Sequence, residues 1–155
     1  MRPPRYRGDV LLAALLAGAA LAVSPAAAAA PAVPVDGTYK GTMTDGQPVR
    51  VVVVDGRVDT AFATVRRYSC EQFGELGPMA VAVRANAPIV KRKFTFDAGR
   101  TPSYLTMHGT FSARTKGKDK GTVTGKLRAY GTIATGTKCT SPTRGFTLRL
   151  VKPKR

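Results

Sequence analysis

The sequence predicts an all-β protein, an antiparallel meander of about eight strands that forms a small sandwich or barrel after an N-terminal signal peptide. Three observations predict this fold. Apolar and polar side chains alternate along the chain, which places them on opposite faces of strands. The alternating runs are short and separated by Gly, Pro, Asn and Asp, which are typical of turns. Helical periodicity is weak after residue 30.

The first 30 residues are typical of a secretory signal peptide. Three arginines precede an apolar run at residues 10–23, and small alanines follow at residues 26–30. The run is shorter than the roughly 20 residues needed to cross a bilayer, and an uncleaved membrane anchor is the alternative. We therefore expect a secreted protein, extracellular or associated with the cell wall, with no transmembrane segment in its mature form. Its parts are an Ala/Pro-rich linker at 31–36, a β domain at 37–151 and a basic tail at 152–155.

Alternation and turn residues define each expected element in order. The strands are residues 37–44, 49–54, 57–68, 79–84, 89–96, 103–112, 122–130 and 146–151. Asp55 and Gly56 give the strongest hairpin signal, between the second and third strands. Turns are expected at residues 45–48, 86–88 and 97–102, and loops at residues 70–78, 113–121 and 131–142. In the strand at 89–96, Lys91 and Lys93 are predicted to face outward.

Both cysteines, Cys70 and Cys139, follow the predicted signal peptide. An exported chain meets an oxidising compartment, so a disulfide is the expected pairing. It would close a loop of about 70 residues, worth about 4 kcal/mol in the chain-entropy model. Two separate buried thiols are the alternative, and a metal site is disfavoured because no suitable His or Cys is nearby.

Charge is the strongest anomaly of the composition. The formal net charge is +16, and +14 without the leader. Residues 31–112 contain ten Lys or Arg and seven Asp or Glu, whereas residues 113–155 contain twelve and one. Such a field favours association with polyanions.

We therefore expect an anion-binding surface made of the loop at 113–121 and the outer faces of two strands. The candidate residues are Lys91, Lys93, Lys116, Lys118, Lys120, Lys126 and Arg128. Teichoic acid, anionic lipid headgroups and extracellular nucleic acid are candidate partners, bound with release of counterions. Tyr104 and Tyr130 can add stacking, but aromatic residues are too sparse for a specific single-strand nucleic-acid platform. A merely solubilising surface is the alternative.

The sequence offers no catalytic constellation. His108 is the only histidine, and its strand position indicates a solvated side chain. A Ser-His-Asp triad would need an orienting carboxylate and a nearby serine, and the Gly-x-Ser-x-Gly elbow is absent. The serines considered are Ser69, Ser103, Ser112 and Ser141, and the aspartates at turn-like positions are Asp36, Asp45, Asp55, Asp97 and Asp119. We expect no enzymatic activity, no cofactor and no metal site.

Three motifs resemble a broad group of small secreted β-rich domains of actinobacterial type. They are GTYKGT at residues 37–42 followed by DGQPV at 45–49, GTFS at 109–112 and KCTS at 138–141. The resemblance implies an antiparallel meander framed by a Gly-x-Tyr-x-Gly opening strand and two cysteines, and it supplies no catalytic residues. Members often have Trp in the last strand, where this chain has Phe146.

The expected function is binding by a monomeric, non-enzymatic domain at the cell envelope. Two alternatives stay open. A lipocalin-like barrel would carry a small apolar ligand in its interior. An extracellular interaction or inhibitor module would act through the loop at 70–78.

Overall fold

The computed structural model describes residues 34–113, 121–133 and 135–151 of the chain. These residues form eleven antiparallel strands in one sheet. The strands are β1 (Gly37–Met43), β2 (Pro48–Val54), β3 (Arg57–Val65), β4 (Tyr68–Cys70), β5 (Gly74–Leu76), β6 (Met79–Pro88), β7 (Lys93–Arg100), β8 (Ser103–Phe111), β9 (Thr122–Thr132), β10 (Lys138–Thr140) and β11 (Arg144–Leu150). Within these ranges no helical segment has the length and apolar character that crossing a membrane requires.

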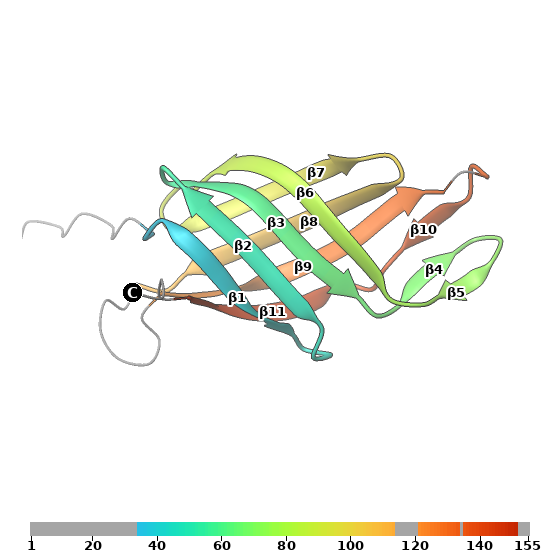
Figure 1. Cartoon of the computed structure of the whole chain (residues 1–155), viewed down its shortest axis with the longest axis horizontal. Helices are drawn as coiled ribbons and strands as arrows, with labels where there is room; N and C mark the ends of the chain where they lie inside the picture. The colour runs from blue at the N-terminus through green and yellow to red at the C-terminus, as the bar shows by residue number, and fades with distance from the viewer. Residues whose placement is uncertain (1–33, 114–120, 134, 152–155) are drawn as a thin grey trace, which may run out of the picture.

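The sheet curls into a nearly closed barrel, as Figure 1 shows. The long strands pair in the order β7-β8-β9-β11-β1-β2-β3-β6. A bridge between Val90 and Lys93 links the chain leaving β6 to the start of β7. The predicted all-β antiparallel meander is confirmed. Of the two architectures left open by the sequence, the barrel is the one observed, with three short strands beyond the eight expected.

Apolar side chains of alternate residues fill the barrel, as the pattern predicts. Along β9, Leu127 is buried while the preceding Lys126 is exposed. The buried side chains form one hydrophobic cluster. Within it the Phe111 ring lies 5.2 Å from the Tyr39 ring and 5.7 Å from the Phe94 ring, measured between centroids. Full burial of such a side chain contributes about 1.5–3 kcal/mol, so this cluster is the main source of stability.

Two glycines allow neighbouring backbones to approach closely. A Cβ atom added to Gly41 would collide with the carbonyl oxygen of Thr147 on β11. A Cβ atom added to Gly125 would collide with the carbonyl oxygen of His108 on β8. Because the obstacles are backbone atoms, no change of rotamer relieves them. The glycines in the first and ninth strands are therefore required by strand packing.

The turn predicted at residues 86–88 is wrong, because these residues belong to β6. Asn86 has a positive φ of 45° and lies where the register between β3 and β6 shifts. The Arg57 side chain donates to the Asn86 side-chain oxygen at 2.8 Å and to its carbonyl oxygen at 2.6 Å. The irregularity is thus an internal bulge and not a chain reversal.

The chain reverses later, at Lys91 and Arg92, where φ is 48° and 66°. Val90 and Lys93 exchange backbone hydrogen bonds of 2.9 Å around these two residues. The strand predicted at residues 89–96 therefore begins only at Lys93. Two-residue turns with positive φ usually contain Asn, Asp or Gly, so the Lys-Arg sequence did not indicate this turn.

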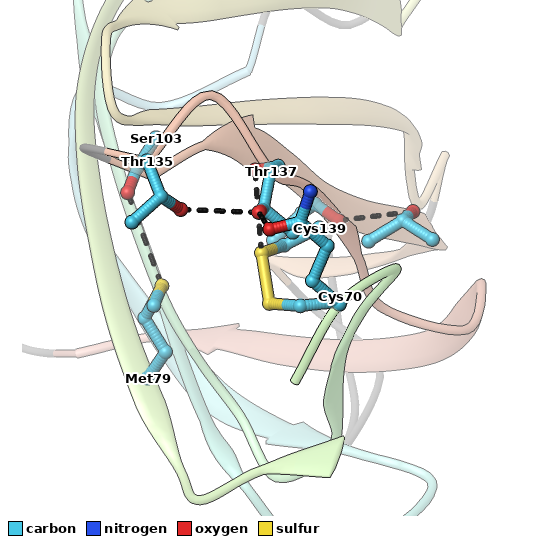
Figure 2. The surroundings of a disulfide bond; sticks show 9 residues. Cys70, Met79, Ser103, Thr135, Thr137 and Cys139 are labelled. Atoms are coloured by element: carbon cyan, nitrogen blue, oxygen red, sulfur yellow. Dashed lines mark hydrogen bonds between the residues drawn. A yellow bond between two sulfur atoms is a disulfide. The ribbon is translucent and has the colours of Figure 1, made fainter. Parts of the chain in front are cut away.

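The disulfide between Cys70 and Cys139 is confirmed, with an S–S distance of 2.01 Å and a Cα–Cα distance of 4.0 Å. The two cysteines are directly opposite each other on β4 and β10, so both predicted loops contain strands. Figure 2 shows Thr137 beside the disulfide, and its hydroxyl donates to Gln72 Oε1 at 2.7 Å. The β4–β5 hairpin extends past the barrel, with Phe73 exposed near its turn (Figure 1).

Candidate anion-binding surface

Four of the seven predicted anion-binding residues lie in the described part of the chain. Lys93, Lys126 and Arg128 are exposed on the outer face of the sheet formed by β7, β8 and β9. Lys91 occupies the turn before β7 and not the strand face predicted for it. The other three, Lys116, Lys118 and Lys120, lie outside the described residues. The fold thus places three predicted cations on one face.

Four threonines cross this face from strand to strand. Thr110 on β8 is opposite Lys93 on β7 and Thr124 on β9. Thr147 on β11 lies between Thr124 and Thr42 on β1. All four threonines are exposed, and neighbouring strands are about 4.8 Å apart. These residues, here named the threonine row, therefore present hydroxyl groups in sequence across β8, β9, β11 and β1.

Three cations that the sequence analysis missed form a row of their own beside the threonine row. Arg149 on β11 is opposite Lys40 on β1, and Lys40 is opposite Arg50 on β2. All three are exposed. We name them the cation row. It lies two residues, or about 7 Å, along the strands from the threonine row. Lys126 lies at a similar distance on the other side, so positive charge flanks the hydroxyls.

The cation row places like charges on directly opposed residues, an arrangement that destabilises a sheet. The Arg50 guanidinium lies 5.7 Å from the centroid of the Phe62 ring, within range of a cation–π interaction. No carboxylate is opposite Lys40 or Arg50 in the strand pairs described. A hollow of about 260 Å³ opens here, lined in part by Lys40, Arg50 and Phe62. The surface is therefore positive, concave and able to accept an anionic group.

The sequence contained a signal for two of these three cations. A hairpin around Asp45 and Gly46 with Thr42 opposite Pro48 necessarily places Lys40 opposite Arg50. Arg149 joins them only through the pairing of β1 with β11, near the two ends of the described chain. That contact is long-range and leaves no local pattern in the sequence.

The predicted position of His108 on an outer strand face is the one observed. Its opposed residues are Thr95 on β7 and Lys126 on β9, so neither direct cross-strand neighbour is a serine or a carboxylate. Among the described residues, no group of three or more His, Cys, Asp or Glu side chains is arranged to hold a metal ion.

Of the five aspartates predicted at turn-like positions, three lie at or beside turns and one lies in a strand. Asp36 accepts hydrogen bonds from the backbone N–H groups of Asp55 and Gly56, at 2.9 and 3.3 Å. Asp45 accepts one from the Gln47 N–H at 3.3 Å. Asp97, expected in a turn, is instead an outward residue of β7. Asp119 lies outside the described residues.

Comparison with protein families, with curated proteins and with solved structures found no match for this chain. The resemblance to small secreted β-rich domains therefore stays a prediction.

Proposed function

We propose that the protein is a secreted, non-enzymatic β domain that binds an anionic polymer outside the cell or at the cell envelope. The binding surface is the basic band, which consists of Lys40, Arg50, Lys93, Lys126 and Arg149 around the threonine row. The observation that carries this proposal is the cation row, in which three like charges occupy opposed positions on adjacent strands.

The repulsion between the cations of the row favours binding of a polyanion. Like charges on opposed residues repel, so the pair of Lys40 and Arg50, which has no carboxylate opposite it, opposes folding in the absence of a ligand. A bound polyanion reverses the sign of this contribution and releases its own condensed counterions. The threonine hydroxyls add neutral hydrogen-bond donors between the charges. A solubilising role alone would be served as well by cations placed away from one another.

The shape of the basic band favours a flexible polymer over a flat lipid surface. The band runs over six consecutive strands of the barrel, β7, β8, β9, β11, β1 and β2. These strands cover both the near and the far side of the barrel in Figure 1. A flat surface contacts one side of a barrel, whereas a flexible chain can follow its curve. The packed hydrophobic cluster inside the barrel favours surface binding over carriage of an apolar ligand.

The disulfide supports the secreted location, because such bonds persist in oxidising compartments and are rare in the cytosol. The proposed export also fits the leader at residues 1–30, which lies outside the described residues.

A charge-matched pair of variants tests the proposal. The first combines Lys40→Gln, Arg50→Gln and Lys126→Gln. The control combines Arg66→Gln, Arg67→Gln and Arg84→Gln, which removes three charges outside the basic band. Affinity of the full chain for poly-L-glutamate and polygalacturonate is measured at low salt. The band variant should lose about tenfold or more in affinity for both polymers, and the control about twofold or less. Equal losses would show that only net charge matters and would overturn the proposal.

A further inference from the structure

A second hollow, of about 450 Å³, opens on the outer surface where β9 pairs with β10. Its volume falls in the range of about 300–1,000 Å³ usual for small-molecule sites. The side chains relevant to binding are those of Tyr104, Arg128, Tyr130, Thr132, Lys138 and Thr140. Cys139 also lines the hollow and forms the disulfide with Cys70. We name this hollow the tyrosine groove.

Three contacts hold the Tyr130 ring that forms one wall of the groove. Its hydroxyl donates to Asp97 Oδ1 at 2.7 Å. Its ring stacks on that of Tyr104, with centroids 5.2 Å apart and planes 13° apart. The Arg128 guanidinium lies 5.7 Å from its centroid. Because Asp97 is on β7, the side chain reaches across β8 and away from β10. Tyr104 and Tyr130 thus form an aromatic wall of the groove that is already ordered.

The lining of the groove combines aromatic rings with positive charges and hydroxyl groups. It contains two cations, Arg128 and Lys138, and no carboxylate. Thr132 is opposite Lys138, and Thr140 is opposite Tyr130, so two hydroxyls lie on the strands that form the groove. A matching ligand has an apolar ring face, several hydroxyl groups and a negative charge. A pyranose with a carboxylate has all three, since one face of the sugar ring presents C–H groups that pack on an aromatic ring.

We propose that the tyrosine groove binds a uronic acid residue, so that the anionic polymer bound by the protein is an acidic polysaccharide. This inference rests on the proposed function and names its ligand class. On β9 the outward residues run from Tyr130 through Arg128 and Lys126 to Thr124 of the threonine row. A chain with one sugar in the groove can therefore continue along β9 to the basic band, about 13 Å away.

The alternative polymers fit this arrangement less well. Single-stranded nucleic acid is held by stacking successive bases on several aromatic rings. Here the aromatic pair is at one end of the path, and the outward residues that follow it along β9 are Arg128, Lys126 and Thr124. A polyanion without rings would make no use of the aromatic wall.

Three probes distinguish these cases: polygalacturonate, poly-L-glutamate and polyuridylate, compared at equal ionic strength with the full chain. The variant is Tyr130→Ala, and the matched control is Tyr130→Phe, which keeps the ring and loses the hydroxyl. Tyr130→Ala should weaken binding of polygalacturonate about tenfold and leave poly-L-glutamate within about twofold. Tyr130→Phe should keep more of the polygalacturonate affinity than Tyr130→Ala.

Other outcomes overturn the inference in separable ways. Equal effects of Tyr130→Ala on polygalacturonate and poly-L-glutamate would remove the sugar site and leave the basic band in place. A larger loss for polyuridylate than for polygalacturonate would identify a nucleic-acid site. Absence of binding to all three polymers by the unaltered protein would instead overturn the proposed function. Lys138→Gln gives a second test that spares the ring, and it should weaken polygalacturonate more than poly-L-glutamate.

Discussion

The Tyr130 hydroxyl on β9 donates a hydrogen bond to Asp97 on β7, across the intervening strand β8. This bond is the main cause of a rise in the pKa of Tyr130 above its ordinary value of 10.0, with a further contribution from burial. The Asp97 carboxylate accepts a hydrogen bond from the protonated Tyr130 hydroxyl and disfavours the ionised form of the tyrosine. The same bond holds the Tyr130 ring, which stacks on Tyr104 and lines the tyrosine groove.

Asp97→Asn should therefore lower the pKa of Tyr130 toward 10.0. The measurement is a pH titration of the tyrosine ring carbons by NMR. Tyr39 is an internal reference, because burial is the first cause of its raised pKa and Asp97 is not among the others. An unchanged pKa at Tyr130 would show that the hydrogen bond is not formed in solution.

The raised pKa also determines how this bond depends on pH. The folded state holds the phenolic proton more tightly than the unfolded state. The stabilising contribution is fully present below the unfolded pKa of about 10 and is lost as the pH rises through the folded pKa. Alkaline unfolding should thus be less steep for Asp97→Asn than for the unaltered chain in the same pH window.

Lys40, in the middle of the cation row, should lower stability through its directly opposed neighbour Arg50. Lys40→Gln should raise the free energy of unfolding by about 0.3–1 kcal/mol at low salt, and the gain should vanish at high salt. Urea unfolding at two salt concentrations measures both effects. Lys93→Gln is the control, since Lys93 is opposite Thr110 and relieves no such repulsion. A loss of stability in Lys40→Gln at low salt would contradict the repulsion.

The disulfide closes a loop with a sequence separation of 69 residues. Replacing both Cys70 and Cys139 by Ser should lower the free energy of unfolding by about 4 kcal/mol, chiefly through greater freedom of the unfolded chain. Chemical denaturation of the oxidised chain and the double variant gives the difference. The barrel strands lie outside the β4–β10 contact, so the far-ultraviolet circular dichroism of the folded variant should be nearly unchanged. A loss below about 1 kcal/mol would contradict the estimate.

Gly125 tests the close packing of β8 against β9. Gly125→Ala introduces a Cβ atom against the backbone of His108 and Gly109 and within 2.7 Å of the Phe146 ring. We expect a loss of about 2–3 kcal/mol in the free energy of unfolding. Gly77→Ala is the matched control, because a Cβ atom there meets no atom within 4 Å. Similar stabilities for the two variants would show that the strands are less tightly packed than described.

The parts of the fold that are readable from the sequence are those set by local pattern. Alternation correctly placed Leu127 inside and Lys126 outside, because a strand has a strict two-residue period. The Asp55–Gly56 turn was identified because its residues suit positive φ. The turn at Lys91 and Arg92 was missed, because those residues adopt positive φ through their surroundings and not by preference.

The remaining features depend on contacts between distant parts of the chain. The three-residue strands β4 and β10 pair with each other through Cys70 and Cys139, far apart in the chain, and neither strand is long enough to show a pattern. The sequence predicted only part of the candidate surface, because the other part depends on such long-range contacts. Lys126 and Arg128 follow from alternation within β9, but the approach of Arg149 to Lys40 requires the barrel to close through β1 and β11.

The central claim is that the basic band binds a polyanion, and the salt dependence of binding tests it most directly. The dissociation constant for polygalacturonate is measured over a range of salt concentrations with the full chain. Neutralisation by the five cations of the band predicts a slope of about −4 for the logarithm of the association constant against the logarithm of salt concentration. A slope near zero, or an absence of binding at low salt, would contradict the account.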